Sequence, residues 1–264
     1  SCRRRWSPAQ SHVSLVSKRT ALAAKALRGI VPVEKDGSAH FYVPADRNIY
    51  FSVLDEDFME LQRERTYVNY RPGENRSCIG CHETPQDAPP RSMKRPMAMG
   101  KPPVMPGPQP GDRRADRPIH YPVDVQPVLD KYCVSCHEEL SGELTRAFCR
   151  SYEKLLNMEN VPTYREWKDF EGTEYSPAKS IGSYRSKLAR RLIKGCSTME
   201  KPIPVEARLK ITTWIDASGV YYGSYFGCYR GVRGFFVVFC FVQLVRRVLD
   251  YVGVVFVNFG AVLY

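Results

Sequence analysis

The first 33 residues contain no aspartate or glutamate, while Arg and Lys recur from Arg3 to Arg28. A basic segment of this kind is typical of a solvated, loosely ordered arm, which we expect over residues 1–29. Aromatic residues are not interleaved with these basic side chains, and no known nucleic-acid-binding fold accompanies them. We therefore expect no nucleic-acid partner.

An uninterrupted apolar segment of membrane-spanning length is also missing. The basic start has no apolar core of the kind that a secretory signal needs. The tail over residues 231–264 is apolar and β-branched, but Arg246, Arg247 and Asp250 interrupt it. We expect this tail to be a buried segment, or debris of the reading frame, rather than a membrane anchor. Membrane association stays open at this point.

Histidine is scarce, with 5 residues against 9 cysteines, yet two of the five directly follow a Cys-x-x-Cys pair. This pentapeptide is the attachment sequence for c-type haem, in which two thiols form thioethers and the adjacent imidazole binds the iron. The sequence predicts two covalently attached haems, with Cys78, Cys81 and His82 holding the first and Cys133, Cys136 and His137 the second. A pair of zinc knuckles is the alternative, but a knuckle needs no histidine directly after its second cysteine.

The remaining five cysteines are odd in number and irregularly spaced, so no disulfide framework is legible. Haem attachment of this kind takes place outside the bacterial cytoplasmic membrane. We therefore expect a periplasmic or otherwise exported protein, whose signal peptide is missing from this fragment. The net charge of +11 favours acidic redox partner proteins, because complementary charge speeds weak encounters.

Residues 30–82 predict a β-rich domain that ends in the first haem motif. Strands are expected at 30–34, 39–43 and 49–54, with Asp36-Gly37 suiting a hairpin turn between the first two. Residues 58–70 are ambiguous but favour a further strand. His40 lies inside the second predicted strand, where we expect a structural role and keep a distal haem ligand as the alternative.

Half of the 20 prolines lie in residues 83–118. Proline fixes φ and removes a hydrogen-bond donor, so neither a helix nor a central strand can run through this stretch. We interpret it as an extended linker between two haem modules. Its methionine thioethers could bind an iron, although loose packing on a neighbouring surface is the preferred interpretation. These methionines are Met93, Met97, Met99 and Met105.

Residues 119–230 predict a mainly helical domain. Asp124 can cap a helix whose apolar residues recur at helical spacing up to Tyr132, directly before Cys133. Further helices are expected over 183–193, ended by Gly195, and over 205–217, closed by Gly219. The fold class is therefore α+β: a β-rich middle domain followed by a mainly helical, cytochrome c-like domain.

Several stretches resemble the hydrazine synthase alpha subunit family and its planctomycete-type multidomain relatives. The likeness covers roughly residues 28–230, and the two haem motifs are its most specific part. The other matching stretches are Val31–Ala39, Val53–Asp57, Tyr70–Glu74, Tyr121–Asp130, Ser183–Leu188, Trp214–Asp216 and Tyr222–Tyr225. The resemblance implies a β-rich middle domain with one haem and a cytochrome c-like domain with a second. It also implies that a β-propeller precedes them and that this chain is a C-terminal fragment.

One departure from the family concerns the distal side of the second haem. Where the family tends to have Gly-His, this chain has Gly195-Cys196. The sixth iron position is then open to Cys196, Met199, His120, an external histidine or water. We favour Met199 or an external histidine, because each alternative has a competing structural use.

Three functions follow as expectations. The leading one is a dihaem c-type cytochrome region that transfers electrons. The rival, implied by the resemblance, is haem-based redox catalysis on small nitrogen compounds at the first haem, which needs an exchangeable axial position and a polar distal pocket. A zinc-binding interaction module is the third and weakest interpretation.

Overall fold

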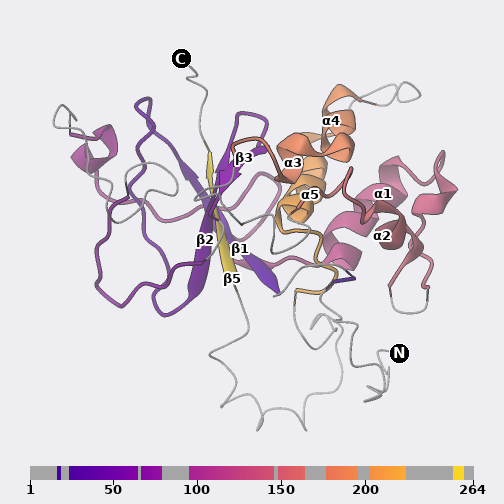
Figure 1. The fold of residues 1–264 in the computed structure, drawn as a ribbon, viewed down its shortest axis with the longest axis horizontal. Helices are drawn as coiled ribbons and strands as arrows, with labels where there is room; N and C mark the ends of the chain where they lie inside the picture. Colours follow the sequence, from indigo (N-terminus) through magenta and orange to yellow (C-terminus); the bar gives the residue numbers. More distant parts are fainter. Residues whose placement is uncertain are drawn as a thin grey trace, which may run out of the picture.

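The computed structural model describes residues 17–18, 24–64, 67–78, 95–145, 148–163, 177–195 and 203–223, and the backbone alone of 252–258. A sheet lies on one side of the molecule and a group of short helices on the other (Figure 1). The strands are β1 Lys25–Pro32, β2 Asn48–Leu54, β3 Glu60–Arg63, β4 Arg117–Pro118 and β5 Val252–Asn258. The helices are η2 Met97–Gly100, η3 Tyr121–Val125, α1 Gln126–Tyr132, η4 Glu138–Leu140, α2 Arg150–Leu155, α3 Gly182–Arg185, α4 Lys187–Lys194 and α5 Val205–Asp216. The chain thus combines strands and helices, as the α+β prediction states at this level.

The sheet has five strands in the order β3-β2-β5-β1-β4. β5, from the apolar tail, runs parallel to both β1 and β2 and pairs with each of them. β3 and β4 pair antiparallel with the outer sides of β2 and β1. Part of the predicted buried tail therefore supplies a central strand, which fits its β-branched composition.

Two strand predictions need correction. β1 begins at Lys25 rather than at Ile30, because Ala26 and Leu27 are buried and pair with the 117–118 segment. Residues 39–43 do not pair back onto β1 as a hairpin. Instead Phe41 forms an isolated parallel bridge with Val104. In both cases a partner far along the chain replaces the local one that the pattern predicts.

The described part of the Pro-rich stretch, residues 95–118, lies against the sheet. The backbone of Gly107 exchanges two hydrogen bonds with Ile30, both 2.9 Å long. Tyr42 N–H donates to the Val104 carbonyl at 2.9 Å, and β4 pairs with β1. Gly107 and β4 satisfy backbone groups on the side of β1 that faces away from β5, so this part of the stretch is a packed element of the sheet side.

The predicted helix over 183–193 is two helices. Ser186 is extended, and its hydroxyl accepts a hydrogen bond from the Ala189 N–H, so α4 starts anew after α3. Gly195 follows α4 with φ of +81°, as its predicted role at the helix end requires. α5 matches the prediction over 205–217 within one residue. α2 was not predicted from the sequence.

The helical side has an aromatic core. The Trp214 ring lies 5.0 Å from that of Tyr121, which in turn lies 5.0 Å from that of Tyr152. Trp214 Nε1 donates to the Val220 carbonyl at 2.9 Å, and the Tyr152 hydroxyl donates to the Gly219 carbonyl at 2.7 Å. These bonds hold the turn after α5 against the core, so their polar groups stay satisfied inside it. Among the described residues, no helix is both long and apolar enough to cross a membrane.

Candidate haem site

The second Cys-x-x-Cys-His motif lies on the turn that follows α1. Cys133 is half-buried against the core, whereas Cys136 and His137 are exposed. The N–H groups of Cys136 and His137 both donate to the Cys133 carbonyl, at 3.1 and 2.9 Å. This tight turn brings two cysteine thiols and one imidazole together at the end of a helix.

The His137 ring has a neighbour that can set its orientation. Its Nδ1 lies 3.5 Å from a carboxylate oxygen of Glu139. The backbone N–H of Glu139 donates to its own carboxylate and lowers the pKa of Glu139, and the His137 charge lowers it to a smaller extent. This carboxylate is therefore ionised at neutral pH. An acceptor beside Nδ1 leaves Nε2 as the ring nitrogen for a metal, which is the usual arrangement of ligating histidines.

The donor set of this turn fits a covalent haem. Both thiols and the imidazole carry chemistry that c-type attachment uses. The neighbouring Tyr132 and Leu140 are partly buried apolar side chains packed against the core. Such side chains on both sides of the motif can pack against a porphyrin edge. His137 and both cysteines would hold the haem, supplying one axial ligand and two thioether links.

Asp124 does not cap the helix in the predicted way. Its carboxylate accepts from the His120 N–H at 2.7 Å and from Arg117 Nη1 at 2.9 Å. Arg117 also pairs with Asp112 at 2.5 Å. Through Arg117, Asp124 therefore connects the segment before α1 to β4 and to the Pro-rich stretch. Helix α1 begins at Gln126 without a side-chain cap.

The ring of His120, one of the suggested sixth ligands, is already hydrogen-bonded inside the core. It is 4% exposed, and its Nδ1 accepts the Gly223 N–H at 3.1 Å. Burial lowers the pKa of His120, which favours the neutral ring. In a neutral imidazole whose Nδ1 accepts, the proton sits on Nε2, so neither nitrogen offers a lone pair to an iron. This geometry argues against His120 as the ligand.

Only Cys78 of the first motif belongs to the described residues, and Cys81 and His82 lie outside them. Cys78 is exposed at the end of the segment 67–78. This segment follows the sheet, because Val68 exchanges hydrogen bonds with Ile49, and Tyr70 accepts from the Asp46 N–H at 2.8 Å. The segment that leads to the first motif is therefore held against β2 at Val68.

The other suggested ligands are exposed or outside the described part of the chain. His40 is exposed, and its Nδ1 lies 3.2 Å from the Lys101 carbonyl. Met97, Met99 and Met105 are 48%, 55% and 73% exposed. Met93, Cys196 and Met199 lie outside the described residues. Of the candidates in the described part of the chain, His120 is hydrogen-bonded inside the core, and His40 and the three methionines are exposed.

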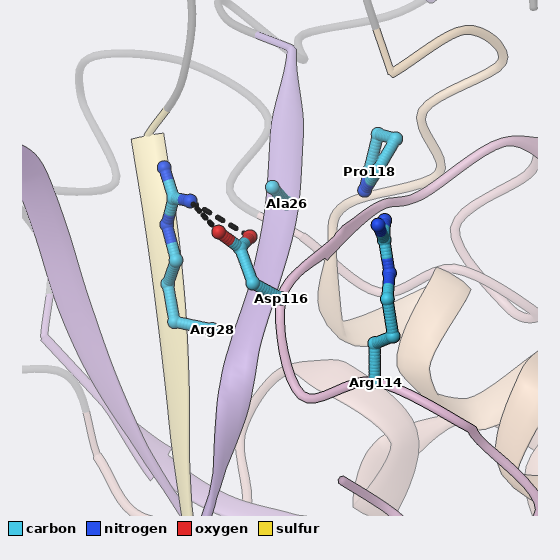
Figure 2. A pocket seen from close by; sticks show the side chains of 5 residues that line it. All are labelled: Ala26, Arg28, Arg114, Asp116 and Pro118. Carbon is cyan, nitrogen blue, oxygen red and sulfur yellow. Dashed lines mark hydrogen bonds and ion pairs between the residues drawn. The ribbon is translucent and has the colours of Figure 1, made fainter. Parts of the chain in front are cut away.

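The described residues hold no further metal site, and a cavity among them lies away from the second motif. No cluster of three or more His, Cys, Asp or Glu side chains suited to a metal ion occurs within the described parts of the chain. A cavity of about 360 Å³ is lined by Ala26, Arg28, Arg114, Asp116 and Pro118. Figure 2 shows Arg28 pairing with both carboxylate oxygens of Asp116, at 2.7 and 2.8 Å, while Arg114 extends toward Pro118. Cys78 and the residues of the second motif, which the structure describes, do not line this cavity.

Comparison with known proteins finds a similarity that includes the first motif. Residues 4–83 match the family model of the hydrazine synthase alpha subunit middle domain, and this segment includes all of Cys78–His82. Over residues 4–83 the chain is hydrazine synthase alpha-like. No curated protein and no solved structure matches the chain.

The match confirms the family resemblance that the sequence motifs predict. The hydrazine synthase alpha-like segment contains β1, β2 and β3, and it begins within the basic start of the chain. It covers less than a third of the 264 residues, and the helices from α1 to α5 lie beyond it. The second motif is therefore assigned from its own geometry.

Proposed function

We propose that this chain is a dihaem c-type cytochrome region that transfers electrons in an exported protein. One observation carries the proposal: Cys133, Cys136 and His137 share one exposed turn at the end of α1, with a carboxylate beside the histidine Nδ1. The first motif has the same five-residue pattern and starts at the exposed Cys78. Two identical donor sets support two covalent haems.

The bound haem supplies a metal centre that accepts and releases one electron. The chain's own residues orient the iron ligand and leave the site accessible to a partner. The Glu139 carboxylate beside Nδ1 orients the His137 ring and strengthens its Nε2 as a donor. The exposure of Cys136 and His137 leaves this edge open to a partner protein, which suits electron transfer by weak encounter.

Catalysis at the first haem is the second candidate, and the family match is the observation that favours it. Residues 4–83 are related to the middle domain of the hydrazine synthase alpha subunit at family level. Redox chemistry on small nitrogen compounds at Cys78–His82 would follow from that relationship. A fold can host several functions, so the relationship supports this activity without assigning it.

Carbon monoxide separates the two candidates, because it binds only a reduced iron with an exchangeable axial position. If both haems only transfer electrons, reduction and reoxidation of the matured chain should be reversible, and carbon monoxide should leave the spectrum of both haems unchanged. Rapid binding to one haem would favour catalysis. Alanine at both Cys78 and Cys81 should then abolish the carbon monoxide signal, while alanine at both Cys133 and Cys136 should retain it.

A further inference from the structure

A cluster of buried charged side chains joins the sheet to the helices. Glu60 and Asp216 are each 1% exposed, and Arg63 is 6% exposed. Glu60 and Arg63 belong to β3, whereas Asp216 is the last residue of α5. Charged groups are expensive to bury, so each of them needs a partner or a proton. These residues lie where β3 meets α3 and α3 meets α5.

Glu60 is paired directly with a buried arginine. Its Oε1 accepts from Arg63 Nε at 2.7 Å, and its Oε2 accepts from the Ser52 hydroxyl at 2.7 Å. Arg63 Nη1 also donates to the Ser218 hydroxyl at 3.1 Å. The guanidinium therefore neutralises Glu60 directly.

Asp216 is held differently. Its Oδ1 accepts from the Ser183 N–H at 2.6 Å, and its Oδ2 accepts from the Ser183 hydroxyl at 2.9 Å. Among the described residues, no ion pair joins Asp216 to a lysine or arginine. A Cβ on Gly182 would lie 2.3 Å from Glu60 Oε1 and 2.8 Å from Asp216 Oδ1, so these two oxygens are close neighbours. Two carboxyl groups this close cannot readily both be charged.

The other titratable groups around the cluster do not pair with Asp216. Lys25 Nζ, from β1, donates to the Ala217 carbonyl at 3.0 Å and to Ser218 at 3.2 Å. Burial, with a smaller effect of Arg63, lowers the pKa of Lys25 to about 7. Burial also raises the pKa of Tyr50, from β2, so its hydroxyl is neutral.

Two cations on other faces of α5 have their own partners. Arg208 pairs with Asp57, and Lys210 pairs with Asp112. Among the described residues, therefore, Glu60 and Arg63 are the charged groups with the largest effects on the pKa of Asp216. Burial raises the pKa of Asp216 well above its ordinary range, and the Glu60 charge raises it further, against the smaller opposing effects of Arg63 and Ser183.

We propose that Asp216 is a proton-binding site at the junction of the sheet and the helices, and that its bound proton holds the junction together at neutral pH. The Ser183 hydroxyl, which donates to Asp216, accepts the Glu60 N–H at 2.8 Å, so one short path of bonds links α5, α3 and β3. Loss of the proton places a second negative charge beside Glu60 and weakens this link. Because α5 also contacts α1, the same proton stabilises the helical frame that presents Cys133.

The sign of the pH dependence follows from proton counting. Above the ordinary pKa of an aspartate the unfolded chain has released this proton, while the folded chain keeps it. Stability from this group is full at acid pH and falls as the pH rises toward the raised pKa of folded Asp216. The unfolding constant should increase up to about tenfold per pH unit in that range. Lys25 works in the opposite direction at higher pH, so the comparison must isolate Asp216.

Asp216→Asn provides that comparison, because the amide has the shape of the protonated carboxyl group and cannot lose a proton. Urea unfolding of the full chain and of the variant would be measured from pH 4 to pH 9. The unfolding constant of the parent divided by that of the variant should rise with pH and then level off. A ratio that is constant or falls with pH overturns the proposal.

Infrared spectroscopy keeps the proposal testable if Asp216→Asn fails to fold. At pH 7 the parent should show the carbonyl band of a protonated carboxyl group. Glu60→Gln removes the neighbouring charge, so the band should persist but disappear at a lower pH than in the parent. Absence of the band from the parent at pH 7, or its persistence in a folded Asp216→Asn chain, contradicts the assignment.

Discussion

A chain in which alanine replaces both Cys133 and Cys136 is expected to carry one covalently bound haem where the parent carries two. The two thiols lie on one turn after α1, and neither is in a disulfide. Without them His137 can still bind iron through its ring, but no thioether remains to hold the porphyrin after denaturation. The measurement is the haem that stays with the polypeptide after extraction with acidified organic solvent.

Cys149→Ala is the matched control for this experiment. Cys149 is also a free thiol, but it is 3% exposed, and its sulfur lies 3.3 Å from the Ser151 hydroxyl inside the core. Its removal should leave two haems per chain. The assignment fails if the double variant keeps both haems, or if the folded control loses one while the double variant does not.

Gly182→Ala should destabilise the folded chain by about 3 kcal/mol, since a side chain is added both at a positive φ and in a filled space. Gly182 has φ of +67°, and the new Cβ would lie 2.3 Å from Glu60 Oε1. Glu60 cannot easily move away, because Arg63 and Ser52 each bind one of its oxygens at 2.7 Å. Urea unfolding at neutral pH measures the change.

Gly73→Ala separates the backbone effect from the steric one. Gly73 has φ of +74°, and nothing lies within 4 Å of a Cβ built there. Its replacement should cost about 1 kcal/mol, from the conformation alone. Equal losses in the two variants would show that the space beside Glu60 and Asp216 is not filled as described.

The sequence predicts those parts of the fold whose signals are local. The helix over 205–217 is correct because its apolar residues and closing glycine lie within one segment, as α5 shows. The split between α3 and α4 escaped prediction because apolar spacing continues across Ser186, which caps α4 instead of continuing α3. The start of β1 at Lys25 was missed because the basic residues around it are typical of a solvated arm, yet Lys25 is held by Ala217 and Ser218.

In the site, too, local patterns were predicted from the sequence and contacts between distant segments were not. The second motif was found from five consecutive residues, and the structure places them on one exposed turn. Nothing in the sequence marks Asp216 as buried beside Glu60, because the two residues meet only through tertiary packing around Gly182. The acidic residue directly after the apolar Trp214 and Ile215 is the one local hint, since both neighbours are fully buried. Contacts between distant segments decide whether such a carboxyl group is solvated or buried.

The most direct test of the account is the mass of the intact, denatured chain after expression with a c-type haem maturation system. The account predicts a chain heavier than its amino-acid sequence by two haems, with both lost only when the cysteines of both motifs are replaced. A chain with the mass of the polypeptide alone, tightly bound zinc and no haem absorption would contradict it.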